Sequence, residues 1–219
     1  MIKAVIFDKD GVLMFTEEAY YRAFRDSLKK FGNGKEFTWE NHCEYVGVPT
    51  SETFFVLRGK YGVRVSYDEF VDDYRAGYNR IFEEEGLKRP DGVTELLDRL
   101  QAENIPFAIG TGGSRPGTEK SLLRTGLRDY FDVIITATEV VKGKPDPETF
   151  MKAAEQLGVD FKECVVIGDS INDVLAAKSA GMKMIAITDK SYSKDPALAS
   201  PDIEVKKFND ITLEMIKSL

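Results

Sequence analysis

The chain has 219 residues, of which 42% are hydrophobic and 31% are charged, and this composition is typical of a globular protein. Its formal net charge of −7 disfavours nucleic acid and membranes as partners, and no uncharged apolar run reaches the roughly 18 residues that a membrane-spanning helix needs. Its single histidine, His42, excludes sites with two histidine ligands and is the one candidate for a serine–histidine–aspartate triad.

The apolar stretch at the N-terminus, within residues 1–11, is too short for a signal peptide, and no small-residue cleavage site follows it. Two cysteines, Cys43 and Cys164, are too few for a disulfide framework. Cys164 opens an apolar run, where a buried reduced thiol is the ordinary expectation. We therefore expect a cytoplasmic protein.

The first predicted element is a buried strand over residues 2–7, after which the pattern changes. Residues 15–86 contain helical patterns and no comparably apolar strand. The helical patterns cover 18–31, 51–60 and 67–85. Sixteen of the chain's 24 aromatic residues fall between Phe15 and Phe82, and large side chains allow a small helical unit to build its own core. The sequence thus predicts a helical domain inserted after the first strand; that some rings also face a substrate is compatible with this.

Beyond residue 86, short apolar runs alternate with helical patterns. The predicted strands are 105–111, 132–136, 163–168 and 183–187, and the predicted helices are 92–103, 118–125, 147–157 and 171–180. Three helices stop at glycines, which are Gly126, Gly158 and Gly181. Pro147 after Asp146 is typical of a first-turn proline behind an N-cap. The alternation predicts an α/β fold with a doubly wound, Rossmann-like parallel sheet from residues 1–14 and 87–219, into which the helical domain 15–86 is inserted.

Acidic side chains follow two of the predicted strands. Asp8 ends the first strand, two residues before Asp10, and Asp169 ends a later strand, four residues before Asp173. Singly, each has a structural explanation, such as a turn at Asp10 or a helix capping box of Ser170 with Asp173. A parallel sheet brings strand ends to one edge, however, and two carboxylates about 4 Å apart repel by about 4 kcal/mol at an effective dielectric near 20. Such a cluster needs a cation, and oxygen ligands suit Mg²⁺.

A hydroxyl and an ammonium are expected at the same edge. Thr111 ends a strand directly before Gly112, and Lys144 lies in a loop that precedes a predicted helix. Each has a structural explanation as a β-branched strand residue or a solvated loop charge, but beside a metal they would offer a hydrogen bond and a charge to an anion. Two nucleotide-binding signatures are incomplete, because Arg115 stands where GxGxxG needs a glycine and the sequence around Gly143 lacks the upstream glycine of a Walker loop.

Four segments, in their order and spacing, resemble the haloacid dehalogenase superfamily, in the branch with a helical cap inserted after the first strand. They are FDKDGVL (7–13), AIGTGG (108–113), VKGKPDPETF (141–150) and VIGDSINDVLAAKSAG (166–181). The resemblance covers essentially the whole chain and includes phosphoglycolate phosphatase and β-phosphoglucomutase-like proteins. It implies a hydrolase of phosphoric monoesters that requires Mg²⁺.

The resemblance also implies a role for each matching residue. Asp8 would be the nucleophile that forms an aspartyl-phosphate. Asp10 would protonate the leaving oxygen and then take a proton from the hydrolytic water. Thr111, Lys144 and the backbone amide of Gly112 would hold the phosphoryl oxygens and stabilise charge in the transition state.

The same resemblance implies a metal site. Mg²⁺ would be bound by a carboxylate oxygen of Asp8, the main-chain carbonyl of Asp10 and the side chain of Asp169, with waters completing the octahedron. Asp173 would orient these ligands or bind the metal from behind them. Two positions depart from the family pattern: Phe15 stands where an acidic or amide residue is common, and Lys9 where an apolar residue is common.

Three functions follow as alternatives. The first is a phosphatase for a small phosphorylated metabolite such as a sugar phosphate or phosphoglycolate, the second a phosphomutase of the β-phosphoglucomutase type, and the third a binding or regulatory protein without catalysis. The presence of Asp10 makes dehalogenation less expected, because a halide leaving group needs no proton. Candidates for reading the substrate are residues 47–52 and Arg58, although a loop that only joins two helices is the simpler interpretation. The sequence leaves the physiological substrate and the oligomeric state open.

Overall fold

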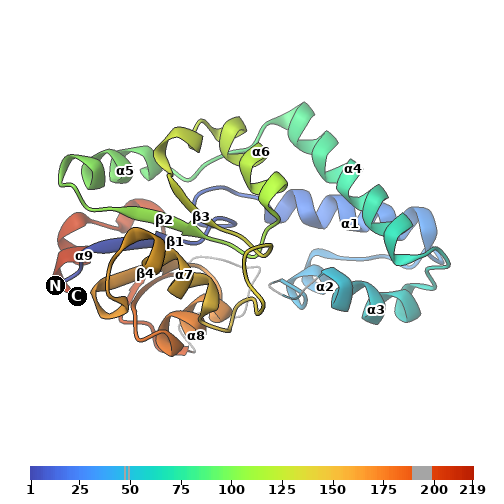
Figure 1. The fold of residues 1–219 in the computed structure, drawn as a ribbon. Coiled ribbons are helices and arrows are strands. Elements are labelled where there is room, and N and C mark those ends of the chain that lie inside the picture. The colour runs from blue at the N-terminus through green and yellow to red at the C-terminus, as the bar shows by residue number, and fades with distance from the viewer. Residues whose placement is uncertain (47, 49, 189–198) are drawn as a thin grey trace. The chain divides into compact units, whose positions relative to one another are not determined.

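The computed structural model describes residues 1–46, 48, 50–188 and 199–219. The chain divides into two compact units (Figure 1). Among the described residues, one unit contains Met1–Phe15 together with the chain from Leu87 onward, and the other contains Thr16–Gly86. We name them the sheet unit and the helical unit.

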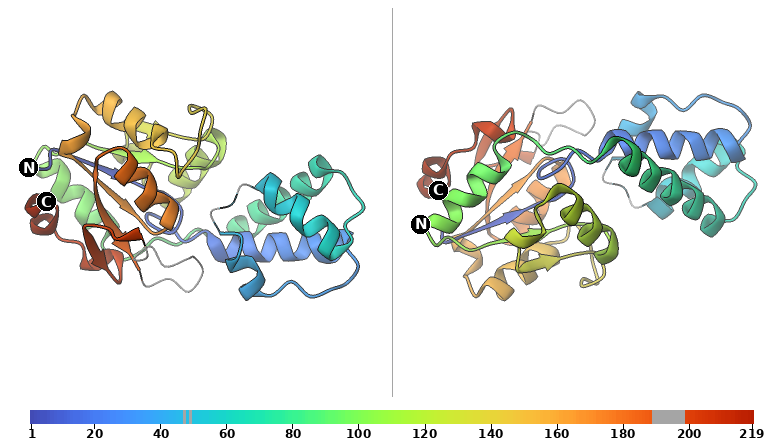
Figure 2. Two further views of the ribbon diagram at one scale, coloured as in Figure 1. Left: turned by 90° about the horizontal axis from the view of Figure 1, so that it is seen from below. Right: turned by 90° about the horizontal axis from the view of Figure 1, so that it is seen from above.

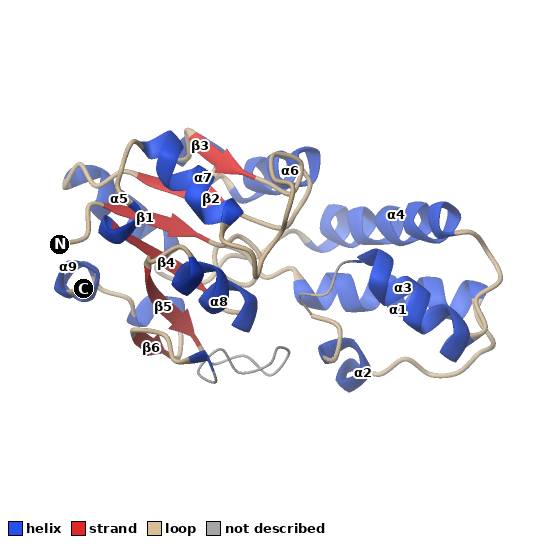
Figure 3. Ribbon diagram, turned by 60° about the horizontal axis from the view of Figure 1, so that its bottom comes forward, coloured by secondary structure: helices blue, strands red, loops and turns tan. Residues whose placement is uncertain are grey.

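The sheet unit is built on a parallel sheet with the order β3-β2-β1-β4-β5-β6, which confirms the predicted α/β class (Figure 3). In the described part of the chain the strands are β1 (Ala4–Phe7), β2 (Phe107–Gly110), β3 (Val133–Ile135), β4 (Cys164–Gly168), β5 (Lys183–Ile187) and β6 (Ile203–Val205). Val5 of β1 pairs with Phe107 on one side and with Val165 on the other. Strand β1 is therefore central. Its four residues are all buried, as expected for a strand covered on both faces.

Helices cover both faces of this sheet. The covering helices are α5 (Val93–Ala102), α6 (Arg115–Thr125) and α9 (Leu213–Ser218) on one face, with α7 (Glu148–Leu157) and α8 (Ile171–Ser179) on the other. Figure 2 views the sheet from opposite sides, with α8 in front of it in the left panel and α5 and α6 in the right. Alternate residues of β1 enter the two cores: Val5 and Phe7 lie in one, Ala4 and Ile6 in the other.

Several helix ends match the sequence, and two starts differ from it. Gly126 and Gly158 close α6 and α7 with φ values of 67° and 70°, and Gly181 follows α8 with φ 72°. Helix α6 begins at Arg115 instead of residue 118, because the side chain of Ser114 accepts the N–H of Gly117 and caps the helix.

The start of α7 corrects a second prediction. Pro147 occupies the N-cap position itself instead of the first turn. The side chain of Asp146, one residue further out, accepts the N–H of Glu148 at 3.1 Å. Among the described residues of the sheet unit, the elements that the sequence did not predict are all short: β6, α9 and the 3₁₀ helices Arg128–Tyr130, Phe161–Glu163 and Phe208–Asp210. Three to six residues are too few to display a period.

The helical unit has an aromatic core, as predicted. Its helices among the described residues are α1 (Glu17–Phe31), α2 (Trp39–Cys43), α3 (Thr50–Tyr61) and α4 (Tyr67–Glu85). Helix α1 packs along α4. The ring centroid of Phe24 lies 5.0 Å from that of Phe70 and 5.5 Å from that of Tyr74. The sequence missed α2, which has five residues and starts at a capping box of Thr38 with Asn41.

The residues proposed to read a substrate fall on α3 and before it. Gly47 and Pro49 of the predicted loop 47–52 lie outside the described residues, and Thr50 begins α3. Arg58 is exposed on α3, and its Nε donates to the carbonyl of Val63 at 3.4 Å. No helix in the described ranges combines the length and apolarity needed to cross a bilayer.

Candidate active site

The carboxyl ends of three neighbouring strands carry predicted site residues. Asp8 follows β1, Thr111 follows β2 and Asp169 follows β4, and the side chains are buried, with 7%, 1% and 5% of the residue surface exposed. The sheet ladder continues into two of them. The N–H of Asp8 donates to the carbonyl of Ile167 at 2.8 Å, and that of Thr111 to Ile135 at 2.9 Å. The last rungs of a parallel sheet therefore fix these residues side by side at one edge.

Lys144 joins this edge from the loop between β3 and α7. Its Nζ donates to Oδ1 of Asp8 at 2.6 Å and to Oδ1 of Asp173 at 2.7 Å. The ammonium also lies 4.7 Å from the ring centre of Phe150, which fits a cation–π contact. The structure thus brings Lys144 together with two of the predicted carboxylates, and its side chain is only 10% exposed.

Asp173 has two functions in the structure, capping α8 and binding Lys144. The side chain of Ser170 accepts the N–H of Asp173, and Oδ2 of Asp173 accepts the N–H of Ser170 at 3.1 Å and its hydroxyl at 2.6 Å. This is the predicted capping box. One oxygen of Asp173 therefore serves the helix start while the other faces Lys144.

Three of the carboxylates form a group that could hold a metal ion. One oxygen from each of Asp8, Asp169 and Asp173 lies within 4.8 Å of the other two, and all three residues are buried. The Lys144 ammonium balances part of their negative charge. A compact, buried set of carboxylate oxygens with surplus negative charge fits a hard divalent cation such as Mg²⁺. These residues therefore fit the metal that the sequence predicts.

Burial is the largest influence on the electrostatics of Asp8. Burial raises the pKa of Asp8 from 3.8 to about 7, the Lys144 ammonium opposes this shift, and the charges of Asp173 and Asp10 add to it. Burial also acts against the charge on Lys144, but the carboxylates of Asp173 and Asp8 outweigh it, and the pKa of Lys144 lies above its ordinary value. Lys144 is therefore a permanent cation, whereas Asp8 needs a positive charge in addition to Lys144 to stay ionised near neutral pH.

The loop after β2 presents a hydroxyl and exposed backbone. Oγ1 of Thr111 accepts the N–H of Gly113 at 3.0 Å, which fixes the hydroxyl, and Gly112 between them is exposed. The start of α6 directly after this loop adds little, because Pro116 has no N–H and the N–H of Gly117 is bound by Ser114. The hydroxyl and the exposed backbone together suit an anion.

Asp10 has a neighbour that the sequence did not assign. The Nζ of Lys9 lies 2.5 Å from Oδ1 of Asp10, and Lys9 is 3% exposed whereas the Asp10 side chain is 23% exposed. Sequence reasoning noted Lys9 as a departure without finding its partner. Adjacent side chains on a strand point to opposite faces, but Lys9 and Asp10 lie beyond β1, at the turn where Gly11 has φ 78°.

The chain matches known proteins along most of its length. A family model described as haloacid dehalogenase-like hydrolase matches residues 5–187. The chain is 36% identical to the phosphorylated carbohydrates phosphatase of Thermotoga maritima, over 84% of each protein. It is 31% identical to pyrophosphatase PpaX of Bacillus velezensis, over 96% of this chain and 94% of that protein.

Solved structures give the same picture of the fold. The structure of a candidate β-phosphoglucomutase from Thermotoga maritima is 34% identical, with a TM-score of 0.81 and full coverage of both chains. CbbY from Rhodobacter sphaeroides in complex with phosphate has a TM-score of 0.86 over 99% of this chain and 100% of that one. At 24% identity, CbbY is similar in fold alone.

Proposed function

The chain belongs to the haloacid dehalogenase-like hydrolase family, and from this premise we propose that it is a Mg²⁺-dependent phosphatase that forms an aspartyl-phosphate on Asp8. It is a phosphoric monoester hydrolase, in line with relatives named phosphatases. One observation carries the proposal: Nζ of Lys144 lies 2.6 Å from Asp8 and 2.7 Å from Asp173. A buried cation beside a carboxylate that must attack an anion lowers the repulsion between the two.

In the first half of the reaction, an oxygen of Asp8 attacks the phosphorus of the ester. The new O–P bond forms as the bond to the leaving oxygen breaks, and Asp10 donates a proton to that oxygen. Thr111, Lys144 and the backbone of Gly112 hold the phosphoryl oxygens as their charge shifts. The partial exposure of Asp10 suits a group that must reach a leaving oxygen at the mouth of the site.

In the second half, water attacks the phosphorus and the bond to Asp8 breaks. Asp10, now without its proton, accepts one from the attacking water, which restores both carboxyl groups and releases inorganic phosphate. Lys144 stays bound to the phosphoryl oxygens during both steps, because its ammonium does not need to move or lose a proton. Each half of the reaction thus uses the same residues.

Mg²⁺ bound by a carboxylate oxygen of Asp8, the main-chain carbonyl of Asp10 and the side chain of Asp169 would neutralise phosphoryl charge and align the ester for attack. Asp173 would support the ligands from behind, through the oxygen that it shares with Lys144. The support for this proposal is that the carboxylates of Asp8 and Asp169 lie, together with that of Asp173, in one compact and buried group of oxygen atoms.

We propose a small phosphorylated metabolite of the sugar phosphate or phosphoglycolate type as the substrate. The phosphorylated carbohydrates phosphatase is the relative whose name supports a sugar phosphate, whereas the PpaX relative is named for pyrophosphate. We further propose that residues 15–86 form a cap that selects the ester and excludes bulk water while the phosphoryl group is transferred to Asp8. Phe15, which is 49% exposed, would give the entrance an apolar character.

A phosphomutase is the second candidate, because the 34% identical Thermotoga maritima structure is described as a candidate β-phosphoglucomutase. A mutase transfers the phosphoryl group back to the sugar instead of to water. The third interpretation, a protein without catalysis, is not supported, because the site keeps the carboxylates, the ammonium and the hydroxyl that the reaction needs.

A panel of phosphate esters, including sugar phosphates, phosphoglycolate and pyrophosphate, tests the proposal. We expect Mg²⁺-dependent release of inorganic phosphate from at least one of them and from a generic aryl phosphate. Isomerised hexose phosphate, formed with catalytic bisphosphate and little free phosphate, would identify the mutase instead. Failure to turn over any member of the panel while Mg²⁺ binds would overturn both enzymatic proposals.

A further inference from the structure

The loop that carries Lys144 is closed by the carboxylate of Glu148. Glu148 is the first residue of α7, and its side chain reaches back along the loop. Its two oxygens each accept the N–H of Val141 at 3.0 Å, and Oε2 also accepts the N–H of Lys142 at 2.8 Å. A carboxylate that binds two successive N–H groups fixes both peptide planes. We call the Glu148 carboxylate and its hydrogen bonds to Val141 and Lys142 the clamp. Lys144 lies in the chain between the residues that the clamp joins.

Packing does not fix this stretch of the loop. The side chain of Val141 is 91% exposed and that of Lys142 is 74% exposed. Neither can be held by burial in an apolar core, so polar contacts order this stretch: the backbone hydrogen bonds to Glu148 and an ion pair of Lys142 with Asp146 at 3.9 Å. An exposed loop without such bonds would sample many conformations.

Lys152, one turn further along α7, connects the clamp to the beginning of the loop. Its Nζ lies 2.7 Å from Oε1 of Glu148 and donates to the main-chain carbonyl of Glu139 at 2.5 Å. The hydrogen bond from Lys152, followed by those from the N–H groups of Lys142 and Val141, lowers the pKa of Glu148 to about 2. The clamp is therefore charged throughout the neutral pH range.

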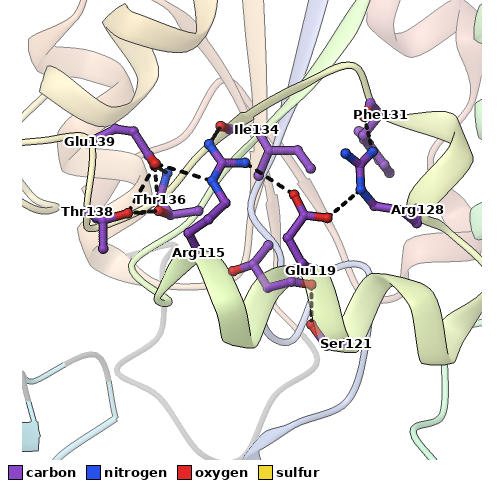
Figure 4. Close-up of polar contacts among 10 residues, drawn as sticks. Arg115, Glu119, Ser121, Arg128, Phe131, Ile134, Thr136, Thr138 and Glu139 are labelled. Carbon is purple, nitrogen blue, oxygen red and sulfur yellow. Dashed lines mark hydrogen bonds and ion pairs between the residues drawn. The ribbon is translucent and has the colours of Figure 1, made fainter.

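The beginning of the loop is anchored separately, at the end of β3. Glu139 accepts the N–H of Thr136 at 2.7 Å as well as its hydroxyl, and Nε of Arg115 donates to Glu139 at 3.2 Å (Figure 4). Arg115 also donates to the carbonyl of Ile134 in β3. The loop therefore leaves β3 from one fixed point and enters α7 at another.

We propose that Glu148 is a positioning residue that acts through Lys144: by holding the backbone at Val141 and Lys142, it sets where the Lys144 ammonium meets Asp8. The inference rests on the proposed function, in which Lys144 holds the transferring phosphoryl group. Glu148 itself touches no reacting atom. A displacement of about 1 Å in such a group can cost a factor of about 10² in rate, so a small movement of the loop suffices.

Glu148→Gln tests the inference, because glutamine keeps the size of the side chain but loses its charge and one acceptor oxygen. We expect kcat/KM to fall at least about tenfold and the affinity for orthovanadate, measured calorimetrically with Mg²⁺, to fall by a similar factor. In the Lys144→Met background, the same change should lower orthovanadate affinity by less than about twofold, because coupled residues are not additive. Hydrogen exchange at the amides of Val141 and Lys142 should become at least about tenfold faster.

Glu163→Gln is the matched control, since Glu163 also pairs with a lysine at 2.7 Å, namely Lys3. It should leave activity, orthovanadate affinity and exchange at residues 141–142 unchanged. If Lys144→Met impairs orthovanadate binding and turnover but Glu148→Gln behaves like the wild type, the inference is wrong and the proposed function stands. If Lys144→Met leaves both measurements unchanged, the proposed function itself fails. If Glu148→Gln lowers orthovanadate affinity by the same factor in the wild type and in the Lys144→Met background, the inference is also wrong, because Glu148 would then act independently of Lys144.

Discussion

The Nζ of Lys144 lies 2.6 Å from Oδ1 of Asp8, although 136 positions separate the two residues in the chain. Both side chains are 10% exposed. Asp8 is placed by the central strand and Lys144 by a loop that leaves an outer strand, so the contact forms only when the whole sheet has assembled. The buried pair is thus a property of the topology, and it joins the proposed nucleophile to the proposed phosphate-binding cation.

Replacing the proposed nucleophile should abolish turnover without unfolding the chain. Asp8→Asn keeps the side-chain shape and an oxygen that can accept from Lys144, but it cannot form an aspartyl-phosphate. We expect phosphate release at background level, with the circular dichroism spectrum of the folded wild type. Asp129→Asn, at an exposed aspartate, should retain full activity. Wild-type turnover by Asp8→Asn would falsify the assignment of the nucleophile.

Removing the ammonium should cost both activity and stability. Lys144→Met leaves the buried carboxylates of Asp8 and Asp173 without their cation. We expect phosphate release to fall by a factor of about 10² or more, and the free energy of unfolding without metal to fall by about 3 kcal/mol, as measured by denaturant titration. Lys162→Met, at an exposed lysine outside this loop, should change neither. Equal effects of the two substitutions would contradict the special role of Lys144.

The stability of the metal-free protein should depend on pH through Asp8. Its pKa is raised from 3.8 to about 7 on folding, mainly by burial. Between these values the folded state retains a proton on Asp8 that the unfolded state has released. The contribution of Asp8 to the free energy of unfolding is therefore complete below pH 3.8 and is lost as the pH rises to about 7. Asp8→Asn cannot titrate and should lack this loss. In thermal melts with chelator, we therefore expect the melting temperature of Asp8→Asn to rise relative to that of the wild type from pH 5 to pH 8. Melting temperatures that change with pH in parallel would refute the raised pKa.

Mg²⁺ should stabilise the folded chain through the carboxylate group. A ligand that binds only the folded state at about 100 times its Kd adds about 2.7 kcal/mol to the free energy of unfolding. We expect Mg²⁺ to raise the melting temperature of the wild type and chelator to stop phosphate release. Asp169→Asn, which removes one member of the group, should weaken both responses, whereas Asp129→Asn should preserve them. Phosphate release that persists in chelator would contradict the metal requirement.

The buried Lys9 gives a prediction about Asp10. Lys9→Met replaces a 3% exposed ammonium with an apolar side chain of similar length and removes that ammonium from the carboxylate of Asp10, which already reaches solvent. We expect stability to be unchanged or higher, because the variant no longer desolvates an ammonium and the carboxylate that remains reaches solvent. Turnover should fall about tenfold, because Asp10 is no longer held in one orientation. Unchanged turnover would show that Lys9 does not orient Asp10.

The sequence predicted the sheet unit well because its strands are continuous apolar runs and its helices end in strong local signals. The runs around β1 and β4 could only be buried strands, and Gly126 and Gly158 stop helices whatever surrounds them. Local signals failed where an element was too short to display a period, as in α2 and β6. They also misplaced the start of α6, where the cap at Ser114 outweighed a weakly apolar first turn.

The sequence by itself determined which chemical groups reach the edge of the sheet, because the side chains that follow buried strands must lie at the strand ends. It could not determine which of these groups touch. That Lys144 bridges Asp8 and Asp173, that Lys9 turns to Asp10 and that Glu148 binds the backbone of the loop were decided by the tertiary structure alone. The physical reason is that such contacts depend on distances between separate elements, which chain connectivity leaves free until packing fixes them.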